Sequence, residues 1–149
     1  MPETTVPLEL RREILSNPNP ELTAEFRRQL EAQWGDVDPF DGAHAGRDVP
    51  GPVIAIDDQD CFIGGLSFTT ALRPGGDDVC VWINTVLVQP EFRGQGIAST
   101  LIEAGERAAD NLGVSELFVL SEYPALYAKR DWVMLDTHEE ASILTKLLT

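Results

Sequence analysis

The first clear hydrophobic pattern is an apolar residue at every fourth position near the start of the chain. The residues at this spacing are Leu22, Phe26, Leu30 and Trp34. Four-residue spacing puts all of them on one side of a helix. Asn19 can cap such a helix and Pro20 suits its first turn, so we predict a helix from Pro20 to about Gly35. Residues 5–10 are either a short first strand or an extended lead-in.

After a polar stretch, short apolar runs separated by turn residues predict strands. The predicted strands are 53–57, 61–72 and 79–88. We expect the second to be weakened or bulged at Gly64-Gly65. The third is apolar on both faces, which predicts a central strand. Residues 35–52 form a loop that is long for a compact domain, which indicates a functional or mobile segment.

Helical and strand patterns alternate in the second half of the chain. A helix is predicted over 94–113, with buried positions at Ile97, Leu101, Ala104, Ala108 and Leu112 and a stop at Gly113. We then expect a strand at 114–120, a short helix at 124–130, and strands at 132–135 and 141–148. The order over 79–120 predicts a right-handed crossover between parallel strands. The fold class is therefore α/β: one domain over residues 1–149, with a mixed sheet and helices on both faces.

Charge narrows the classes of function. The net charge of −14 disfavours nucleic acid and anionic membranes, both of which need an excess of Lys and Arg. No run of about 18 apolar residues predicts a membrane span, and the N-terminus lacks the pattern of a secretory signal. We therefore expect a cytoplasmic protein. The acidic surplus either serves solubility or attracts a cationic partner.

Neither the cysteines nor the histidines form a site in the sequence. Cys61 and Cys80 are expected to be two small buried hydrophobic residues, and Cys80 should lie near residue 71 across a hairpin. His44 and His138 are isolated, and no cluster of ligands has metal spacing. We predict neither a disulfide nor a metal.

Candidate chemistry begins where the third strand ends, in the sequence VLVQPEFRGQGIASTLI. Gly94 and Gly96 open a helix whose first amides have no partner within the helix. Such amides, at the positive end of the helix dipole, bind phosphate oxygens. Arg93 adds a cation, and Ala98 keeps the first turn small. The loop therefore predicts a phosphate-binding site.

Two common phosphate sites fit poorly. A dinucleotide fingerprint would use Gly94 and Gly96, but fewer than 30 residues follow Glu122, too few for the second half of that fold. A nucleoside-triphosphate loop needs a Gly-Lys-Ser/Thr sequence, which is missing.

The sequence resembles the GNAT N-acetyltransferase superfamily in two motifs at the family's spacing. Arg93-x-x-Gly96-x-Ala98, after VLVQPEF and before an amphipathic helix, is similar to the family's acetyl-CoA motif. About 30 residues later, LFVLSEYPALYAKRDWVML is similar to its second motif, a strand, a helix with a tyrosine, and a turn. The resemblance covers roughly residues 50–149. It implies a mostly antiparallel sheet of six to seven strands, splayed at the centre.

The resemblance also implies a cofactor and residue roles. Acetyl-CoA would place its pantetheine arm along the backbone of Val86, Leu87 and Val88. Its pyrophosphate would meet the amides of the loop, which are those of Arg93, Gly94, Gln95, Gly96, Ile97, Ala98 and Ser99. Tyr127 matches the tyrosine that donates a proton to the CoA sulfur, and a phenol pKa of about 10 suits a thiolate leaving group. Possible dimers are also implied.

The sequence departs from the family pattern in three places. The turn after the tyrosine is Asp131-Trp132 instead of Gly-Phe or Gly-Trp, and Asp tolerates positive φ better than most residues. The central strand has no glutamate as general base and offers Trp82, Asn84 and Thr85 instead. Ser121 and Glu122 stand where members often have Asn. Glu122 is either a base that acts through water or a solvated side chain.

The acceptor side is expected to come from the first helix and the loop after it. Trp34, Asp36 and Phe40 put acids beside aromatic rings, which suits a small cationic amine. Trp82, Asn84 and Ser121 complete the candidate acceptor residues. The leading hypothesis is an acetyl-CoA-dependent N-acetyltransferase with a small amine acceptor. The alternatives are a peptide or protein acetyltransferase and an acyl-CoA-binding regulator without catalysis.

Overall fold

The computed structural model describes residues 13–15, 19–34, 49–137 and 140–148. In chain order its elements are β1 (Glu13–Leu15), α1 (Pro20–Trp34), β2 (Val53–Ile56), β3 (Phe62–Leu72), β4 (Val79–Val88), a 3₁₀ turn (Pro90–Phe92), α2 (Ile97–Asn111), β5 (Glu116–Ser121), α3 (Pro124–Ala128), β6 (Val133–Thr137) and β7 (Ser142–Leu147). These match the predicted elements within a few residues, with the second helix beginning at Ile97 instead of residue 94. The predicted strand at 5–10 lies outside the described residues, whereas β1 was not predicted.

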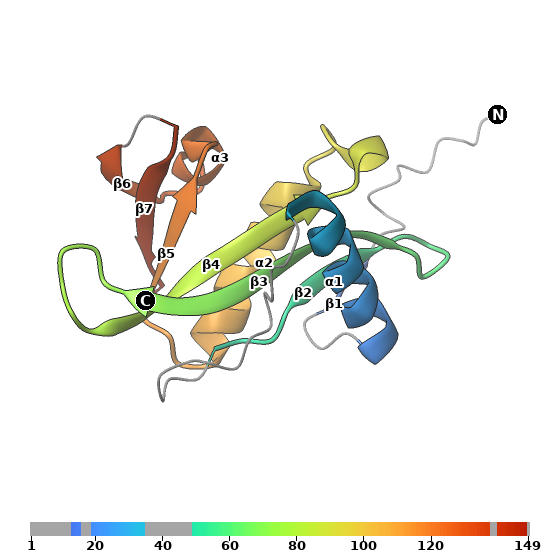
Figure 1. Cartoon of the computed structure of the whole chain (residues 1–149), viewed down its shortest axis with the longest axis horizontal. Helices are drawn as coiled ribbons and strands as arrows, with labels where there is room; N and C mark the ends of the chain where they lie inside the picture. Colours follow the sequence, from blue (N-terminus) through green and yellow to red (C-terminus); the bar gives the residue numbers. More distant parts are fainter. Residues whose placement is uncertain (1–12, 16–18, 35–48, 138–139, 149) are drawn as a thin grey trace.

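The strands form one seven-stranded sheet in the order β1-β2-β3-β4-β5-β7-β6 (Figure 1). β4 is the central strand and pairs in parallel with β5, while the other described neighbours are antiparallel. The mixed, mostly antiparallel α/β fold predicted from the sequence is confirmed, as is the parallel crossover between β4 and β5.

Helices cover opposite faces of the sheet (Figure 1). On one face, Phe26 and Leu30 of α1 are fully buried in a cluster with β2, β3 and β4. The lack of a side chain at Gly65 lets α1 lie close to β3, because a Cβ at that position would come within 2.7 Å of the Phe26 ring. On the other face, Ile97 and Leu101 of α2 belong to the main core. The two predicted amphipathic stripes therefore hold the sheet between them.

Local signals at the helix ends have mixed outcomes. Asn19 Oδ1 accepts a hydrogen bond of 2.9 Å from the Leu22 amide, which confirms the predicted cap. Gly113 follows α2 with φ +93°, as a C-terminal stop requires. Leu112, predicted to be buried, is 45% exposed, because it is already the C-terminal cap of the helix.

The β2–β3–β4 region corrects two expectations. The predicted irregularity at the glycine pair occurs against β2, where the register shifts beside Gly64, but β3 pairs regularly with β4 through both glycines. Cys80 is buried and pairs with Ala71, as predicted. Cys61 is exposed, so its predicted burial is wrong. It lies in the turn before β3, where its amide donates to Asp57 Oδ1.

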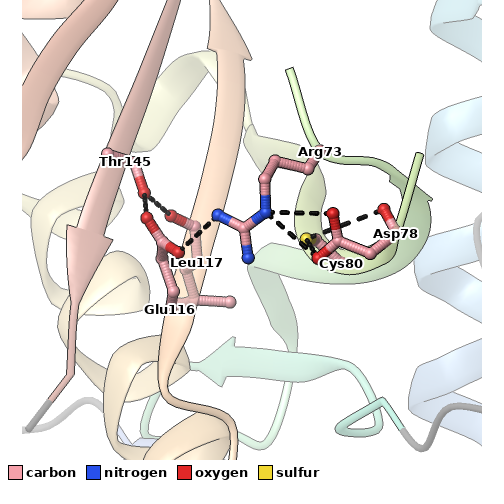
Figure 2. A network of polar contacts seen from close by, with 6 residues as sticks. All are labelled: Arg73, Asp78, Cys80, Glu116, Leu117 and Thr145. Carbon is pink, nitrogen blue, oxygen red and sulfur yellow. Dashed lines mark hydrogen bonds and ion pairs between the residues drawn. The ribbon is translucent and has the colours of Figure 1, made fainter. Parts of the chain in front are cut away.

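A polar network fastens the β3–β4 hairpin to the neighbouring strands (Figure 2). Arg73 Nε lies 3.1 Å from both carboxylate oxygens of Asp78, and Nη1 donates to Glu116 Oε1 at 2.9 Å. Thr145 Oγ1 of β7 lies 2.9 Å from Glu116 Oε2. The hydrogen bond from Arg73 holds the pKa of the Asp78 carboxyl below its usual value. The network therefore joins β3, β4, β5 and β7 at one end of the sheet, where β4 and β5 are paired.

Candidate active site

β4 and β5 pair over only three residues and then separate. Val81, Trp82 and Ile83 lie opposite Leu117, Phe118 and Val119. β4 continues to Val88 and β5 to Ser121 without further pairing between them. Figure 1 shows the two strands diverging from this shared end. The remaining edge of β4 thus has backbone groups that β5 does not use.

A cleft of about 960 Å³ lies at this separation. It is bounded by the second half of β4, the glycine loop, the start of α2, the end of β5, and α3. Of the predicted CoA residues, all except Gln95 line it; these are Val86, Leu87, Val88, Arg93, Gly94, Gly96, Ile97, Ala98 and Ser99. The structure therefore brings the end of β4 and the glycine loop, the two parts of the stretch VLVQPEFRGQGIASTLI, to one cavity.

A β-bulge at the separation decides which β4 side chains reach the cleft. Ser67 pairs with Thr85 and Phe68 with Ile83, so Asn84 is the extra residue. Since one extra residue exchanges the two faces of a strand, Ile83 before the bulge and Val86 after it both pack against the main core. The apolar spacing of β4 breaks at the same place, which is the signal that could have revealed the bulge.

Trp82, one of the predicted acceptor residues, is not among the residues that line the cleft. It precedes the bulge, where its ring stacks on Phe118 with centroids 5.3 Å apart. Its Nε1 is buried without a hydrogen-bond partner in the described part of the chain. Asn84 and Thr85 do line the cleft, the former exposed and the latter half-buried.

Thr85 is held by a second hydroxyl. Its Oγ1 lies 2.8 Å from Ser67 Oγ, and the Ser67 side chain is 1% exposed. A buried hydroxyl hydrogen needs an acceptor, which favours donation from Ser67 to Thr85. Thr85 then keeps its own hydrogen and a lone pair for a molecule in the cleft. The sequence alone marks Thr85 only as a residue on a strand that lacks a glutamate.

The glycine loop has the geometry predicted from its sequence. Gly94 and Gly96 have φ of +77° and +81°, and a Cβ on either would have no atom within 4 Å. The Thr100 amide is the first along α2 to donate to a carbonyl of its own turn, that of Gly96 at 3.1 Å. The amides of Ile97, Ala98 and Ser99 therefore have no acceptor within the helix.

Arg93 is more occupied than predicted. Its amide donates to the Pro90 carbonyl at 3.3 Å, and its Nε donates to the Val88 carbonyl at 2.9 Å. The side chain thus ties the glycine loop to the end of β4. The amides left to meet an anion begin after Arg93.

Tyr127 of α3 enters the wall of the cleft from the core side. It is 3% exposed, and burial raises the pKa of its phenol. Its ring meets that of Trp132 edge-on, with centroids 5.2 Å apart at 72°. Between the two lies Asp131 with φ +72°, so the predicted left-handed turn is confirmed. Tyr127 is therefore a buried, neutral phenol in the cavity wall.

Ser121 and Glu122 lie at the end of β5, in the wall of the same cleft. Ser121 Oγ accepts the Tyr123 amide at 2.9 Å and so helps the chain turn into α3. Glu122 is exposed. The structure thus brings Glu122, Asn84 and Tyr127 to one cavity.

Comparison with known proteins identifies the family. Residues 16–131 match the model of the acetyltransferase (GNAT) family. The chain belongs to this family. The resemblance predicted from the two motifs is confirmed, and by family the chain is an acetyltransferase. No curated protein matches it in sequence.

Solved structures share the fold of this acetyltransferase. One is a GNAT family N-acetyltransferase (YhbS) from Escherichia coli in complex with CoA, with TM-score 0.64, 18% identity, and coverage of 93% of this chain and 82% of that one. N-acetylglutamate synthase from Neisseria gonorrhoeae, complexed with coenzyme A and N-acetyl-glutamate, has TM-score 0.61 and 19% identity, with coverage of 93% of this chain and 35% of that one. The NatC complex bound to Gag peptide and CoA has TM-score 0.61 and 17% identity, with coverage of 93% of this chain and 99% of that one. At identities this low, the structural similarity establishes the shared fold and nothing more.

Part of the predicted acceptor side of the acetyltransferase stays a prediction. Trp34 is the last residue of α1, and the structure describes its backbone but not its side chain. Asp36 and Phe40 fall in 35–48, also outside the described residues, as are His44 and His138. Among described residues, no cluster of His, Cys, Asp or Glu could hold a metal. No helix described is long and apolar enough to cross a membrane.

Sequence reasoning missed Glu106, which carries a buried charge behind the cleft wall. This residue of α2 is 8% exposed and lies among the buried positions of the helix. Burial alone would raise the pKa of its carboxyl, but hydrogen bonds from Arg130, Trp132 and Lys146 outweigh burial and lower it. The available signal was one acidic residue between apolar positions of the α2 stripe.

Proposed function

We propose that this GNAT chain is an acetyl-CoA-dependent N-acetyltransferase that moves an acetyl group directly to the amine of a small cationic acceptor. The observation that carries the proposal is the cleft between β4 and β5, which joins an unpaired strand edge, a helix N-terminus and a buried tyrosine. These are the three parts that acetyl transfer from a thioester requires.

The residues present fit coenzyme A at both ends of the cleft. At one end, the amides from Gly94 to Ser99 precede the first intrahelical hydrogen bond of α2 and suit a pyrophosphate. At the other, Val86, Leu87 and Val88 offer the edge of β4 to an amide-rich arm. Arg93 lies between the ends and would shift from the Val88 carbonyl to a phosphate oxygen. Bound acetyl-CoA would supply the activated acetyl group.

Tyr127 would act as the acid. When the amine nitrogen bonds to the acetyl carbon, the carbon–sulfur bond breaks and Tyr127 gives its proton to the sulfur. The phenol is protonated near neutral pH and therefore has a proton to give, although burial, which raises its pKa, makes it a weaker acid than an exposed tyrosine. Backbone amides of β4 near the bulge would stabilise negative charge on the carbonyl oxygen. The proton that the amine loses would pass first to a base and then through solvent to Tyr127, so that both groups regain their starting protonation.

The cleft offers few candidates for the general base that would take the amine proton. No carboxylate lies on β4, and Glu122 at the end of β5 is exposed. We propose that Glu122 takes the amine proton through water. Asn84, Thr85 and Ser121 would orient the acceptor, with the Thr85 hydroxyl held by Ser67. Trp34, Asp36 and Phe40 complete the proposed acceptor side on sequence grounds. The proposed cytoplasmic location rests on the sequence, and the proposed homodimer rests on the resemblance to the family.

Release of CoA thiol from acetyl-CoA, followed with a panel of amines, tests this function. The panel should contain polyamines, amino sugars, amino acids and short peptides. Turnover with small cationic amines supports the proposal. Turnover with peptides alone would show that the protein is a peptide acetyltransferase instead. Binding of acetyl-CoA without turnover on any amine would favour a regulator.

Tyr127→Phe tests the role of the acid. It should lower kcat about 10²-fold or more, the typical contribution of a general acid, while CoA affinity and melting temperature stay close to those of the wild type. Unchanged turnover would remove Tyr127 from the proposed chemistry.

A further inference from the structure

Glu106 is the centre of a buried network that the proposed chemistry does not use. Its Oε1 accepts from Lys146 Nζ at 3.0 Å and from Arg130 Nη2 at 3.2 Å. Its Oε2 accepts from Trp132 Nε1 at 2.8 Å. One carboxylate therefore joins α2, the turn after α3, and β7. A buried charge with this many donors is costly to disturb, because removing it leaves its partners without an acceptor.

Trp132 connects this network to Tyr127. The Trp132 side chain is 4% exposed, and its ring meets the Tyr127 ring edge-on at 5.2 Å. Its indole has one polar group, Nε1, and that group is fixed on Glu106. Since the two rings are in contact, the carboxylate sets the plane against which Tyr127 packs.

The same network holds the turn that departs from the family pattern. Asp131 takes φ +72°, a conformation that a glycine adopts without strain and other residues adopt at a cost. The residues on either side of it, Arg130 and Trp132, both donate to Glu106. Their amides also both donate to the Tyr127 carbonyl, at 2.9 and 3.2 Å. Lys146 Nζ donates to the Arg130 carbonyl at 2.9 Å. Polar contacts thus fix both flanks of a turn that lacks the family's glycine.

We propose that Glu106 is a positioning residue: through Trp132 and the turn at Asp131, it fixes where the Tyr127 hydroxyl lies in the cleft. The inference rests on the proposed function, since it acts through the acid. Glu106 lies behind Tyr127, not in the cleft wall, and touches no reacting atom.

A double-mutant cycle between Glu106→Gln and Tyr127→Phe tests this role. Turnover is followed as CoA thiol release with the fastest amine of the panel, or with water when no amine reacts. Glu106→Gln should lower kcat about tenfold or more, because a small displacement of a catalytic group has effects of this size. KM for acetyl-CoA should stay within about twofold, since the glycine loop is untouched. In the Tyr127→Phe background, Glu106→Gln should change kcat by less than about twofold.

Glu103→Gln is the matched control. Glu103 lies on the same helix, is exposed, and pairs only weakly with Arg107 at 3.4 Å. Its substitution should leave kcat unchanged. Trp132→Phe is a second variant in case Glu106→Gln folds poorly: it keeps an aromatic ring against Tyr127, removes the N–H, and leaves Arg130 and Lys146 on the carboxylate. It should lower kcat in the same direction.

Fluorine NMR gives a readout that needs no turnover. The chain has two tyrosines, Tyr123 and Tyr127, so fluorotyrosine labelling gives two assignable signals. The Tyr127 signal should shift or broaden in Glu106→Gln and stay in place in Glu103→Gln. An unmoved signal in Glu106→Gln would overturn the proposal.

The kinetic outcomes separate this inference from the proposed function. Equal losses from Glu106→Gln in both backgrounds would show a structural role and overturn the positioning role, while Tyr127 stays the acid. If Tyr127→Phe alone has no effect, the acid role fails, and the positioning role fails with it.

Discussion

Replacing Gly96 by alanine should weaken CoA binding through the backbone alone. Gly96 is the N-terminal cap of α2 with φ +81°, and a Cβ there would have no atom within 4 Å. Any effect must therefore come from the positive φ. A left-handed conformation costs a non-glycine residue about 1–2 kcal/mol. If this strain is relieved in the free protein and restored on binding, affinity falls about 5–30-fold.

Arg93 ties the start of the loop to the end of β4, but the loop is expected to relax at Gly96, because no atom lies within 4 Å of a Cβ at Gly94 or Gly96. The 3₁₀ turn before it has no buried residue, and Gly94 and Gly96 are exposed. Binding must restore the positive φ so that the amides of Gly96 and the first turn of α2 point at the pyrophosphate. Isothermal titration of CoA into each variant measures the loss.

Gly75→Ala is the matched control. Gly75 lies in the β3–β4 turn and does not line the cleft; its φ is +74°, and a Cβ there would have no atom within 4 Å. The strain is the same, so its free energy of unfolding should fall by about 1–2 kcal/mol while CoA affinity is unchanged. Wild-type affinity in Gly96→Ala, or equal loss of affinity in both variants, would refute the reasoning.

Further predictions concern the buried groups. Burial raises the pKa of Tyr127 above its unfolded value, so its contribution to stability is complete below about pH 10 and is lost as pH rises further; Tyr127→Phe should remove this part of the alkaline dependence in denaturant titrations. The lowered pKa of Glu106 works in the opposite direction: its contribution is complete above about pH 4.3 and is lost as pH falls, and Glu106→Gln should flatten that acid limb. Thr85→Val leaves the Ser67 hydroxyl buried without its partner and should cost about 1–3 kcal/mol of unfolding free energy. Adding Ser67→Ala should recover part of that loss, and a larger loss in the double variant would contradict the pairing.

Patterns within a short stretch of chain were predictable. The helix stripe of Phe26 and Leu30, the Asn19 cap, and the glycine loop are local features whose physical cause lies within a few residues. The motif containing Tyr127 was found through the resemblance to the family. These signals were sufficient for the order of elements, the mixed sheet and the family.

Side-chain direction on β4 depended on pairing between distant residues. The bulge at Asn84 exists because β3 and β4 match with one residue in excess, and it exchanges the faces of the strand. Trp82, before the bulge, stacks on Phe118 because the parallel register of β4 and β5 places the two residues opposite each other. The register also decided that Ser67 would meet Thr85.

The sequence by itself thus determined where a phosphate could bind, because glycines, a helix start and a strand end are local properties. Its resemblance to the family indicated which tyrosine could give a proton. The resemblance implied that the sheet is splayed at its centre, but only the tertiary structure decided at which residues β4 and β5 separate and that Glu106 is buried. An acidic residue on a helix is ordinarily exposed. Here three donors from the turn after α3 and from β7, brought together by the fold, make burial of its charge tolerable. The position of the acid depends on contacts among residues 106, 127, 132 and 146, which no local pattern contains.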